Sequence, residues 1–318
     1  MALLDIDGLK TYYIIGDEEV KAVDGVSFRL EEGKSIGLAG ESGCGKTTTV
    51  HSIMRILPPV GKIVAGHIYL EGRDIVSLSD REMNEVRWKQ ISIVFQAAQD
   101  ALNPIVKVED QIAEPLIAHL NYGAKEALWK ARELLRLMGI DPSRGSDYPH
   151  QFSGGMKQRV CIAMALACDP KILIADEPTT ALDVMVQAQI LSLMKDLQKE
   201  YGLSMIYVSH DLSVLSEVCD NIAVMYAGKI CESAETAVLH KSPMHPYTKK
   251  LLKCVTTLER NPEEELETIP GAPPLLINPP PGCRFQPRCE HALPICTKED
   301  PALIDIREGH FVACHLYP

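Results

Sequence analysis

A glycine-rich run at residues 40–48 contains residue types that bind phosphate. It reads Gly40-Glu41-Ser42-Gly43-Cys44-Gly45-Lys46-Thr47-Thr48, and its first eight residues fit the pattern G-x-x-x-x-G-K-[ST]. Glycines allow backbone N–H groups to turn toward phosphate oxygens, while Lys46 would reach the β- and γ-phosphates of a nucleoside triphosphate and Thr47 would hold Mg²⁺. A short apolar run precedes this segment and a helical pattern follows it, which favours a nucleotide-binding loop over an incidental turn.

Two adjacent carboxylates follow an apolar run further along the chain. Residues 172–175 read Ile-Leu-Ile-Ala and lead directly into Asp176 and Glu177. A carboxylate at the end of such a strand can hold Mg²⁺ through water. The next carboxylate can polarise an attacking water as a general base. An ordinary solvated turn is the alternative, and the phosphate-binding run upstream disfavours it.

A second group suited to phosphate is Ser153-Gly154-Gly155, which precedes a helical run at residues 156–168. Serine is a good helix N-cap, and the free N–H groups at a helix start attract anions. Simple capping is the alternative interpretation. Because one phosphate cradle is already complete, a second one indicates a site shared between two subunits.

Three further side chains are candidates because of where the pattern places them. His210 ends the apolar run 206–209 and could contact the γ-phosphate or the attacking water, although a histidine at a strand end is more often structural. Gln96 ends the predicted strand 91–95, and its amide could interact with Mg²⁺ or water. Tyr13 could stack on adenine, and Tyr12 is a near-equal candidate because the strand register is unknown.

Composition limits the class of protein. The chain has 318 residues, of which 46% are apolar, and a formal net charge of −11. This length predicts two domains, and the negative charge offers no basic face to a nucleic acid. We expect neither a secretory signal at the N-terminus nor a membrane span, since apolar stretches such as residues 160–168 are too short. At a membrane, the chain would have to be held by a partner.

The order of the predicted elements indicates an α/β fold. Residues 1–35 alternate polar and apolar positions, which predicts antiparallel strands, whereas a helical insertion is expected from about residue 97. Strands 171–176 and 203–209 then alternate with helices 184–201 and 211–219, as in a parallel sheet covered by helices. Residues 262–318 are rich in proline and lack periodicity, so we expect a loop-rich tail that needs a staple.

Four cysteines in the tail are the candidate staple. Cys283, Cys289, Cys296 and Cys314 have the spacing C-x5-C-x6-C-x17-C, without the close pairs of common zinc sites. Four thiolates still suit an iron–sulfur cluster or a structural zinc, and disulfides or free thiols remain as alternatives. Three histidines could replace a ligand: His291, His310 and His315.

The ordered set of motifs resembles the nucleotide-binding subunit of ATP-binding cassette (ABC) transporters, over residues 1 to about 240. The resemblance assigns Walker A to 40–47, the Q-loop to Gln96, the signature to Ser153–Gly155, Walker B to Asp176, the catalytic carboxylate to Glu177, the D-loop to Ala181-Leu182-Asp183 and the switch to His210. It implies a P-loop (RecA-like) ATPase core in residues 1–240, with an antiparallel β-subdomain and a helical subdomain at about 97–165. Met156 stands where many members have Gln, and Phe152 replaces the common Leu.

The tail is similar to the C-terminal region of oligopeptide and dipeptide importers at residues 245–248, 269–271 and 281–289. This resemblance implies a region 241–318 with metal-binding cysteines that hold a [4Fe–4S] cluster, or zinc instead. It also implies a second homologous ATPase as partner (or a homodimer in isolation), two membrane permease subunits and an extracytoplasmic solute-binding protein. The chain would then lie peripherally at the cytoplasmic face of the membrane and hydrolyse ATP for peptide import. Import of oligosaccharide or nickel, or a soluble ABC-type ATPase, are the alternatives.

Overall fold

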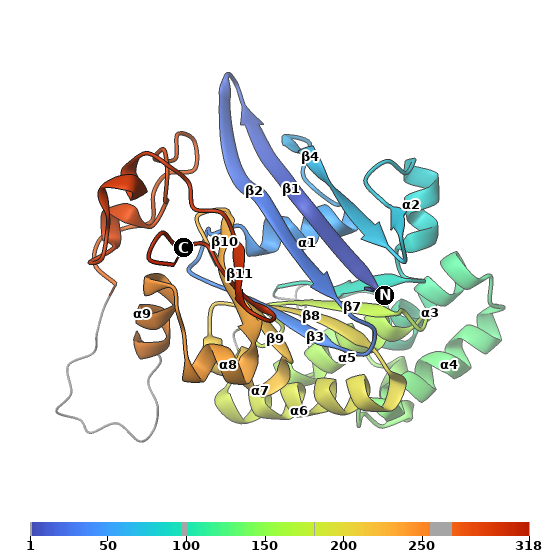
Figure 1. Ribbon diagram of the computed structural model, residues 1–318. Helices are drawn as coiled ribbons and strands as arrows, with labels where there is room; N and C mark the ends of the chain where they lie inside the picture. The colour runs from blue at the N-terminus through green and yellow to red at the C-terminus, as the bar shows by residue number, and fades with distance from the viewer. Residues whose placement is uncertain (1, 97–100, 181, 255–268, 318) are drawn as a thin grey trace. The chain divides into compact units, whose positions relative to one another are not determined.

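The chain divides into two compact units. The computed structural model describes residues 2–96, 101–180, 182–254 and 269–317. The first unit comprises Met1–Glu31, Ser35–Val76 and Val208–Pro318, and the second comprises Glu32–Lys34 and Ser77–Tyr207. Figure 1 shows the labelled elements of both units along the chain.

An antiparallel sheet forms the N-terminal part of the first unit. Its strands lie in the order β2 (Glu18–Leu30), β1 (Leu4–Ile15), β4 (Gly61–Leu70) and β5 (Arg73–Asp74) (Figure 1). Polar and apolar residues alternate along much of β2, so its apolar side chains are buried on one face. The antiparallel strands predicted for residues 1–35 are confirmed.

A second run of strands in the first unit leads to the glycine-rich segment. The order is β11 (Ile304–Arg307), β12 (His310–Val312), β10 (Lys229–Glu235), β9 (Asn221–Tyr226) and β3 (Ser35–Ala39). β3 and β9 pair in parallel, whereas the other neighbours are antiparallel. All five residues of β3 are buried, as expected for a strand that is covered on both faces.

Helices follow several of these strands in the first unit. They are α1 (Lys46–Met54), α7 (Leu212–Val218), α8 (Thr236–Lys241) and α9 (Pro246–Cys254). α1 begins at Lys46 directly after β3 and the glycine-rich segment. The sequence therefore places Lys46 in the first turn of a helix, where backbone N–H groups have no partner within the helix.

The C-terminal region is only partly the loop-rich tail that the sequence predicts. Two short 3-10 helices, η4 (Gln286–Arg288) and η5 (Pro294–Thr297), are surrounded by loops. The hairpin β11–β12, however, extends the sheet, because β12 pairs with the edge of β10 at Glu232 and Ser233. Three residues of β12 are too few to show a periodic pattern, so this pairing was not predicted.

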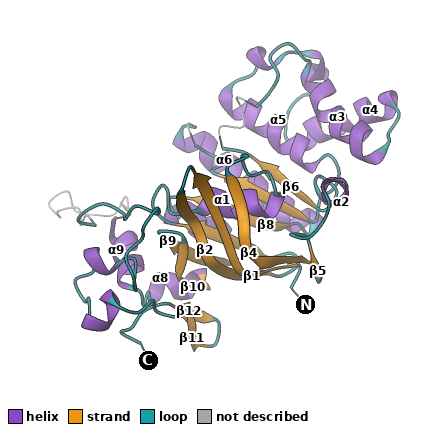
Figure 2. Ribbon diagram, turned by 90° about the horizontal axis from the view of Figure 1, so that it is seen from above, coloured by secondary structure: helices purple, strands orange, loops and turns teal. Residues whose placement is uncertain are grey.

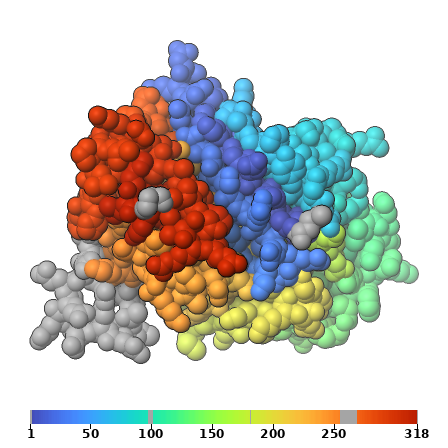
Figure 3. Space-filling model, in the orientation of Figure 1, coloured from blue at the N-terminus to red at the C-terminus, as the bar shows by residue number. Residues whose placement is uncertain are grey.

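An aromatic cluster joins the C-terminal region to the rest of the first unit. The ring of Phe285 lies 5.2 Å from that of Tyr226 and 5.4 Å from that of Tyr247. Nearby, the backbone N–H of Lys21 in β2 donates to the carbonyl of Leu276 at 2.9 Å. Figure 3 accordingly shows the C-terminal residues, in orange to red, beside the N-terminal strands, in blue. Packing of aromatic side chains therefore holds the C-terminal region, in addition to any bond that the four cysteines form.

In the described part of the second unit, strands alternate with a long helix. The strands follow the order β8 (Ser204–Ser209, whose last two residues belong to the first unit), β7 (Ile172–Asp176) and β6 (Ile91–Val94). β6 and β7 are parallel, and α6 (Val184–Tyr201) connects β7 to β8. This alternation of strands and helices was predicted.

The helical insertion of the second unit packs on itself. Its helices are α3 (Val108–Leu120), α4 (Ala124–Leu137) and α5 (Gly154–Leu166), with the 3-10 turns η2 (Pro142–Ser146) and η3 (Pro149–Gln151), whereas α2 (Asp80–Val86) precedes the insertion. α3, α4 and α5 contact one another, and Figure 2 shows them gathered together. Of the helices that the structure describes, none combines the length and the apolar character that crossing a membrane requires.

Candidate functional site

The glycine-rich segment forms a tight loop between β3 and α1. Gly40 and Gly45 have φ angles of +144° and +106°. A Cβ atom on Gly40 would lie 2.2 Å from the carbonyl oxygen of Met225, and one on Gly45 would lie 2.3 Å from that of Ala22. Both positions therefore require glycine, because the loop runs against backbone of two other strands.

Lys46 folds back onto this loop. Its buried Nζ donates to the carbonyl of Gly40 at 2.7 Å and to that of Glu41 at 3.1 Å. The ammonium group thus lies beside the loop backbone, where it would contact a phosphate bound by the backbone N–H groups of the loop. Thr47 and Thr48 occupy the next positions in the first turn of α1.

The structure distinguishes the two tyrosines that the sequence left open. Tyr12 is buried, and its hydroxyl donates to Asp24 at 2.7 Å. Burial and this hydrogen bond raise the pKa of Tyr12 above its usual range. Tyr13 is partly exposed, and its hydroxyl lies 3.0 Å from that of Thr48 in the first turn of α1. Tyr13 is therefore the tyrosine that remains next to the phosphate loop.

In the second unit, Glu177 is fixed at the end of β7. Its backbone adopts a left-handed φ of +47°. Its carboxylate oxygen Oε2 accepts from Gln96 Nε2 at 3.1 Å and from the Thr180 hydroxyl at 3.0 Å. Asp176, the last residue of β7, is 1% exposed. The sequence predicted Gln96 and Glu177 separately, and the structure brings them into direct contact.

Ser153, Gly155 and Asp183 also come together in the second unit. Ser153 caps α5 by accepting from the N–H of Met156 at 3.4 Å, and Asp183 caps α6 by accepting from that of Val186 at 2.9 Å. A Cβ on Gly155 would lie 2.5 Å from Val186 Cγ1, so the start of α5 packs directly on the start of α6. Ala181, part of the predicted D-loop, lies outside the described residues.

His210 belongs to the first unit. It is exposed in the turn between β8 and α7, next to Asp211, whose N–H donates to the Ser209 hydroxyl at 3.0 Å. Its position after β8 agrees with the predicted strand end.

The four tail cysteines lie in one neighbourhood. The N–H of Cys283 donates to the carbonyl of Cys296 at 2.9 Å, and none of the four forms a disulfide. Burial, with smaller contributions from the charges of Cys296, Cys314 and Cys289, raises the pKa of Cys283 to about 11. Among the residues that the structure describes, however, no three His, Cys, Asp or Glu side chains are grouped closely enough to hold a metal ion.

Two of the histidines considered as substitute ligands have other partners. The buried His310 Nε2 lies 2.7 Å from Glu232 Oε1, and His315 Nε2 lies 2.9 Å from the carbonyl of Glu299. His291 is exposed. His310 and His315 are therefore engaged by other groups in this structure.

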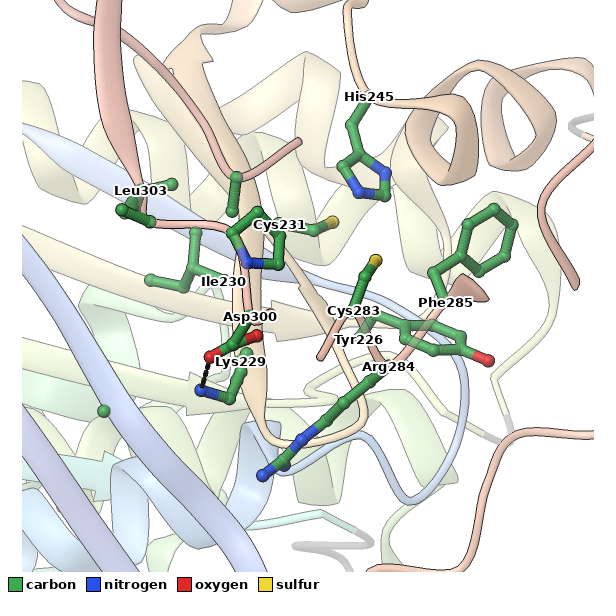
Figure 4. A pocket seen from close by; sticks show the side chains of 14 residues that line it. Tyr226, Lys229, Ile230, Cys231, His245, Cys283, Arg284, Phe285, Asp300 and Leu303 are labelled. Atoms are coloured by element: carbon green, nitrogen blue, oxygen red, sulfur yellow. Dashed lines mark hydrogen bonds and ion pairs between the residues drawn. The ribbon is translucent and has the colours of Figure 1, made fainter. Parts of the chain in front are cut away.

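A cavity of about 220 Å³ borders the cysteine region, and Figure 4 shows it from close by. Cys231 of β10 and Cys283 line it together with His245 and Phe285. Burial raises the pKa of Cys231 well above its usual value, with the charge of Cys283 as a lesser cause. A fifth thiol thus shares the surroundings of Cys283, which the spacing of the tail cysteines alone could not reveal.

Sequence reasoning missed the residues that contact the phosphate loop from the C-terminal region. Arg288 forms an ion pair with Glu41 at 2.8 Å, and the Tyr247 hydroxyl accepts from the Glu41 N–H at 3.0 Å. Both residues lie in segments that the sequence singled out only as family markers. No local pattern identifies a contact over 206 or more positions, so the sequence held no signal for these two contacts.

A phosphate loop after a parallel strand, a carboxylate pair after another strand of the α/β core and an antiparallel sheet define a P-loop ATPase of the ABC class. Comparison with known proteins supports this assignment to the ABC class. The family model "ABC transporter" matches residues 23–180, and the model "Oligopeptide/dipeptide transporter, C-terminal region" matches residues 231–296.

Individual relatives narrow the assignment. The chain is 47% identical to the oligopeptide transport ATP-binding protein OppD of Bacillus subtilis, over 98% of this chain and 87% of that protein. It is 46% identical to the dipeptide transport ATP-binding protein DppD of the same organism, over 99% and 94%. Among solved structures, the ATP-binding cassette MJ0796, a dimer in a post-hydrolysis state bound to ADP and Pi, has a TM-score of 0.65 at 30% identity and covers 73% of this chain and 98% of its own.

The chain belongs to the ATP-binding proteins of the oligopeptide and dipeptide ABC transporter family, and it is the ATPase subunit of such a transporter. The predicted fold is thereby confirmed: an α/β P-loop core with an antiparallel β-subdomain and a helical subdomain. The resemblance to ATP-binding subunits of oligopeptide and dipeptide importers and the predicted ATPase activity are confirmed as well, whereas the member type with a metal-binding four-cysteine motif stays a prediction.

Proposed function

We propose that this chain powers the import of oligopeptides or dipeptides by hydrolysing ATP at the cytoplasmic face of a membrane. The single observation that carries the proposal is Glu177, held after β7 by Gln96 and Thr180 in an orientation suited to a general base. The printed names of the relatives, which are transport proteins for oligopeptides and dipeptides, support the substrate class. Oligosaccharide or nickel import is the second candidate, because the substrate would be selected by other chains.

Uptake by cells tests this proposal. In a strain that lacks the gene, the wild-type chain should restore uptake of labelled dipeptides and oligopeptides, whereas Glu177→Gln should not. Glu200→Gln, at an exposed position in α6, is the matched control and should restore uptake fully. Restored uptake of an oligosaccharide or of nickel, without peptide uptake, would show that the substrate class is wrong. No change in any uptake would contradict a transport role.

The residues divide by role in this proposal. Lys46 and the N–H groups of residues 40–48 bind the ATP phosphates, Tyr13 stacks on adenine, and Thr47, Gln96 and Asp176 hold Mg²⁺. Three sets complete the site: the signature Ser153, Gly154 and Gly155, the D-loop residue Asp183, and the catalytic residues Glu177, His210 and Gln96.

We propose further that two ATPase subunits share the nucleotides, with the signature residues of one subunit binding the ATP of the other. The dimeric structure of the similar cassette MJ0796 supports this arrangement. The exposed Val184 and Met185, at 81% and 71%, offer apolar surface next to Asp183 at the start of α6. The partner would be a homologous ATPase in the cell, with two permease subunits and an extracytoplasmic binding protein completing the transporter.

The proposed domain division follows the motifs. Residues 1–240 carry the ATPase machinery, with the helical subdomain at about 97–165, and residues 241–318 carry the C-terminal cysteines. We propose that Cys283, Cys289, Cys296 and Cys314 hold a [4Fe–4S] cluster, with zinc as the alternative. Four free thiols whose charges influence one another are the donor set that both groups need. The cluster would supply a structural clip for the tail.

Metal analysis tests the cysteine proposal. Anaerobically purified protein should contain about four irons and four acid-labile sulfides per chain and absorb broadly in the visible range. Cys296→Ser should lose most of the iron, whereas Cys254→Ser, outside the set of four, should retain it. One zinc per chain in a colourless protein would support the alternative. Absence of both metals from anaerobic material would refute a metal-binding role.

A further inference from the structure

Glu41, the second residue of the phosphate loop, is held by two residues of the C-terminal region. The guanidinium of Arg288 contacts both oxygens of its carboxylate, with Nη1–Oε2 at 2.8 Å and Nη2–Oε1 at 3.0 Å. The Glu41 N–H donates to the hydroxyl oxygen of Tyr247 at 3.0 Å. The side chain of Glu41 is therefore held by a residue that lies 247 positions further along the chain, and its backbone by one that lies 206 positions further.

Arg288 is itself held rigidly. Its side chain is 5% exposed. Besides the two bonds to Glu41, it donates to the carbonyls of Pro270 at 2.8 Å and Ile269 at 3.2 Å, and to the hydroxyl of Tyr226 at 3.2 Å. These contacts use the five N–H donors of the guanidinium group. A buried, fully bonded and bidentate arginine fixes the orientation of its carboxylate partner as well as its charge.

Glu41 in turn supports the rest of the loop. Its carbonyl accepts from Lys46 Nζ at 3.1 Å and from the N–H of Cys44 at 3.2 Å. The same residue thus links the lysine and the turn of the phosphate loop to Arg288 and Tyr247. A displacement of the C-terminal region would move Glu41 and would alter the loop shape directly.

We propose that Arg288 and Tyr247 are positioning residues for ATP binding, which act by holding Glu41. The inference rests on the ATP-binding role proposed above for residues 40–48. A loop that already has its bound shape loses less conformational freedom when phosphate binds, so affinity is higher than for a loop that must be ordered. The C-terminal region would then set the affinity of the ATPase for its nucleotide.

The chain offers a matched control for this inference. Lys229 in β10 forms an ion pair with Asp300 of the C-terminal region at 2.5 Å, drawn as a dashed line in Figure 4. This pair also joins the tail to the rest of the first unit, but it makes no contact with Glu41. Asp300→Asn therefore removes a tail contact without removing a loop contact.

The test is the dissociation constant for ATP, measured on the full chain without hydrolysis, together with thermal unfolding. Arg288→Gln should weaken ATP binding by about tenfold or more. Arg288→Lys should weaken it by less, because an ammonium keeps the positive charge, although it cannot make both bonds to Glu41. Tyr247→Phe removes one oxygen from a fully buried ring and should weaken binding by roughly threefold to tenfold. Asp300→Asn should stay within about twofold. Turnover at saturating ATP should stay near that of the wild type, because the loss lies in binding.

The combined variant separates a specific pair from general damage. Glu41→Gln with Arg288→Gln should weaken binding no more than the stronger single change, because each breaks the same pair. Additive losses, or equal losses for Arg288→Gln and Asp300→Asn, would overturn the inference. Tyr247→Phe keeps the test available if Arg288→Gln fails to fold. If Lys46→Ala binds ATP as tightly as the wild type, the ATP-binding role itself is wrong and the inference falls with it.

Discussion

Replacing Glu177 with Gln should lower the rate of ATP hydrolysis by about 10²–10⁴-fold while leaving ATP binding intact. The amide oxygen of the substituted side chain can still accept from Gln96 and Thr180, whose donors lie 3.1 and 3.0 Å from the carboxylate oxygen in the structure. The geometry should therefore persist, and what is lost is the ability to take a proton from water. In the proposed dimer, ATP that cannot be hydrolysed should hold two subunits together.

The measurement is phosphate release at saturating ATP, with ATP binding and sedimentation followed on the same samples. Glu200→Gln makes the same chemical change at an exposed position in α6 and should hydrolyse ATP at the wild-type rate. Wild-type turnover by Glu177→Gln would show that Glu177 only closes the turn after β7. Lost ATP binding would instead indicate a structural defect.

Gly45→Ala should lower the free energy of unfolding by about 3–5 kcal/mol. Two costs combine there: the φ of +106°, which residues with a side chain rarely adopt, and the 2.3 Å approach of a Cβ to the Ala22 carbonyl. The neighbouring carbonyl belongs to a paired strand and cannot move aside cheaply.

Gly43→Ala is the matched control in the same loop. Gly43 also has a positive φ, +78°, but a Cβ there would meet no atom within 4 Å. Only the conformational cost remains, about 1 kcal/mol. Urea unfolding of both variants checks the difference. Equal losses for the two would mean that the close approach to Ala22 contributes nothing.

Local patterns predicted the parts of the site that lie in continuous segments. The phosphate loop, the carboxylates after β7 and the cap of α5 each depend on a few adjacent residues whose types specify a turn, a strand end or a helix start. The choice between Tyr12 and Tyr13 was different, because pairing of β1 with β2 shifts register between Leu9 and Lys10 and between Thr11 and Tyr13. Alternation alone cannot assign a face across such irregularities.

Contacts between distant segments were beyond the sequence for a related reason. Arg288 reads as one basic residue in a proline-rich stretch, and nothing near it indicates that its partner is Glu41. The strand β12 pairs with β10, which lies far from it along the chain. Such features depend on where the folded chain brings segments together, so they become visible only in the structure.

The pairing of β12 with β10 also concerns the order in which the protein is made. β10 leaves the ribosome long before β12, because residues 236–309 lie between them. Until then its outer edge is open, and Glu232, whose carboxylate later accepts from Met244, His245 and His310, lacks the last of these partners. Open strand edges recruit strands of other molecules. Chains that end before residue 310, through premature termination or proteolysis, are thus expected to aggregate. The open edge of β10 is also where chaperones or proteases of the cell would bind the incomplete chain.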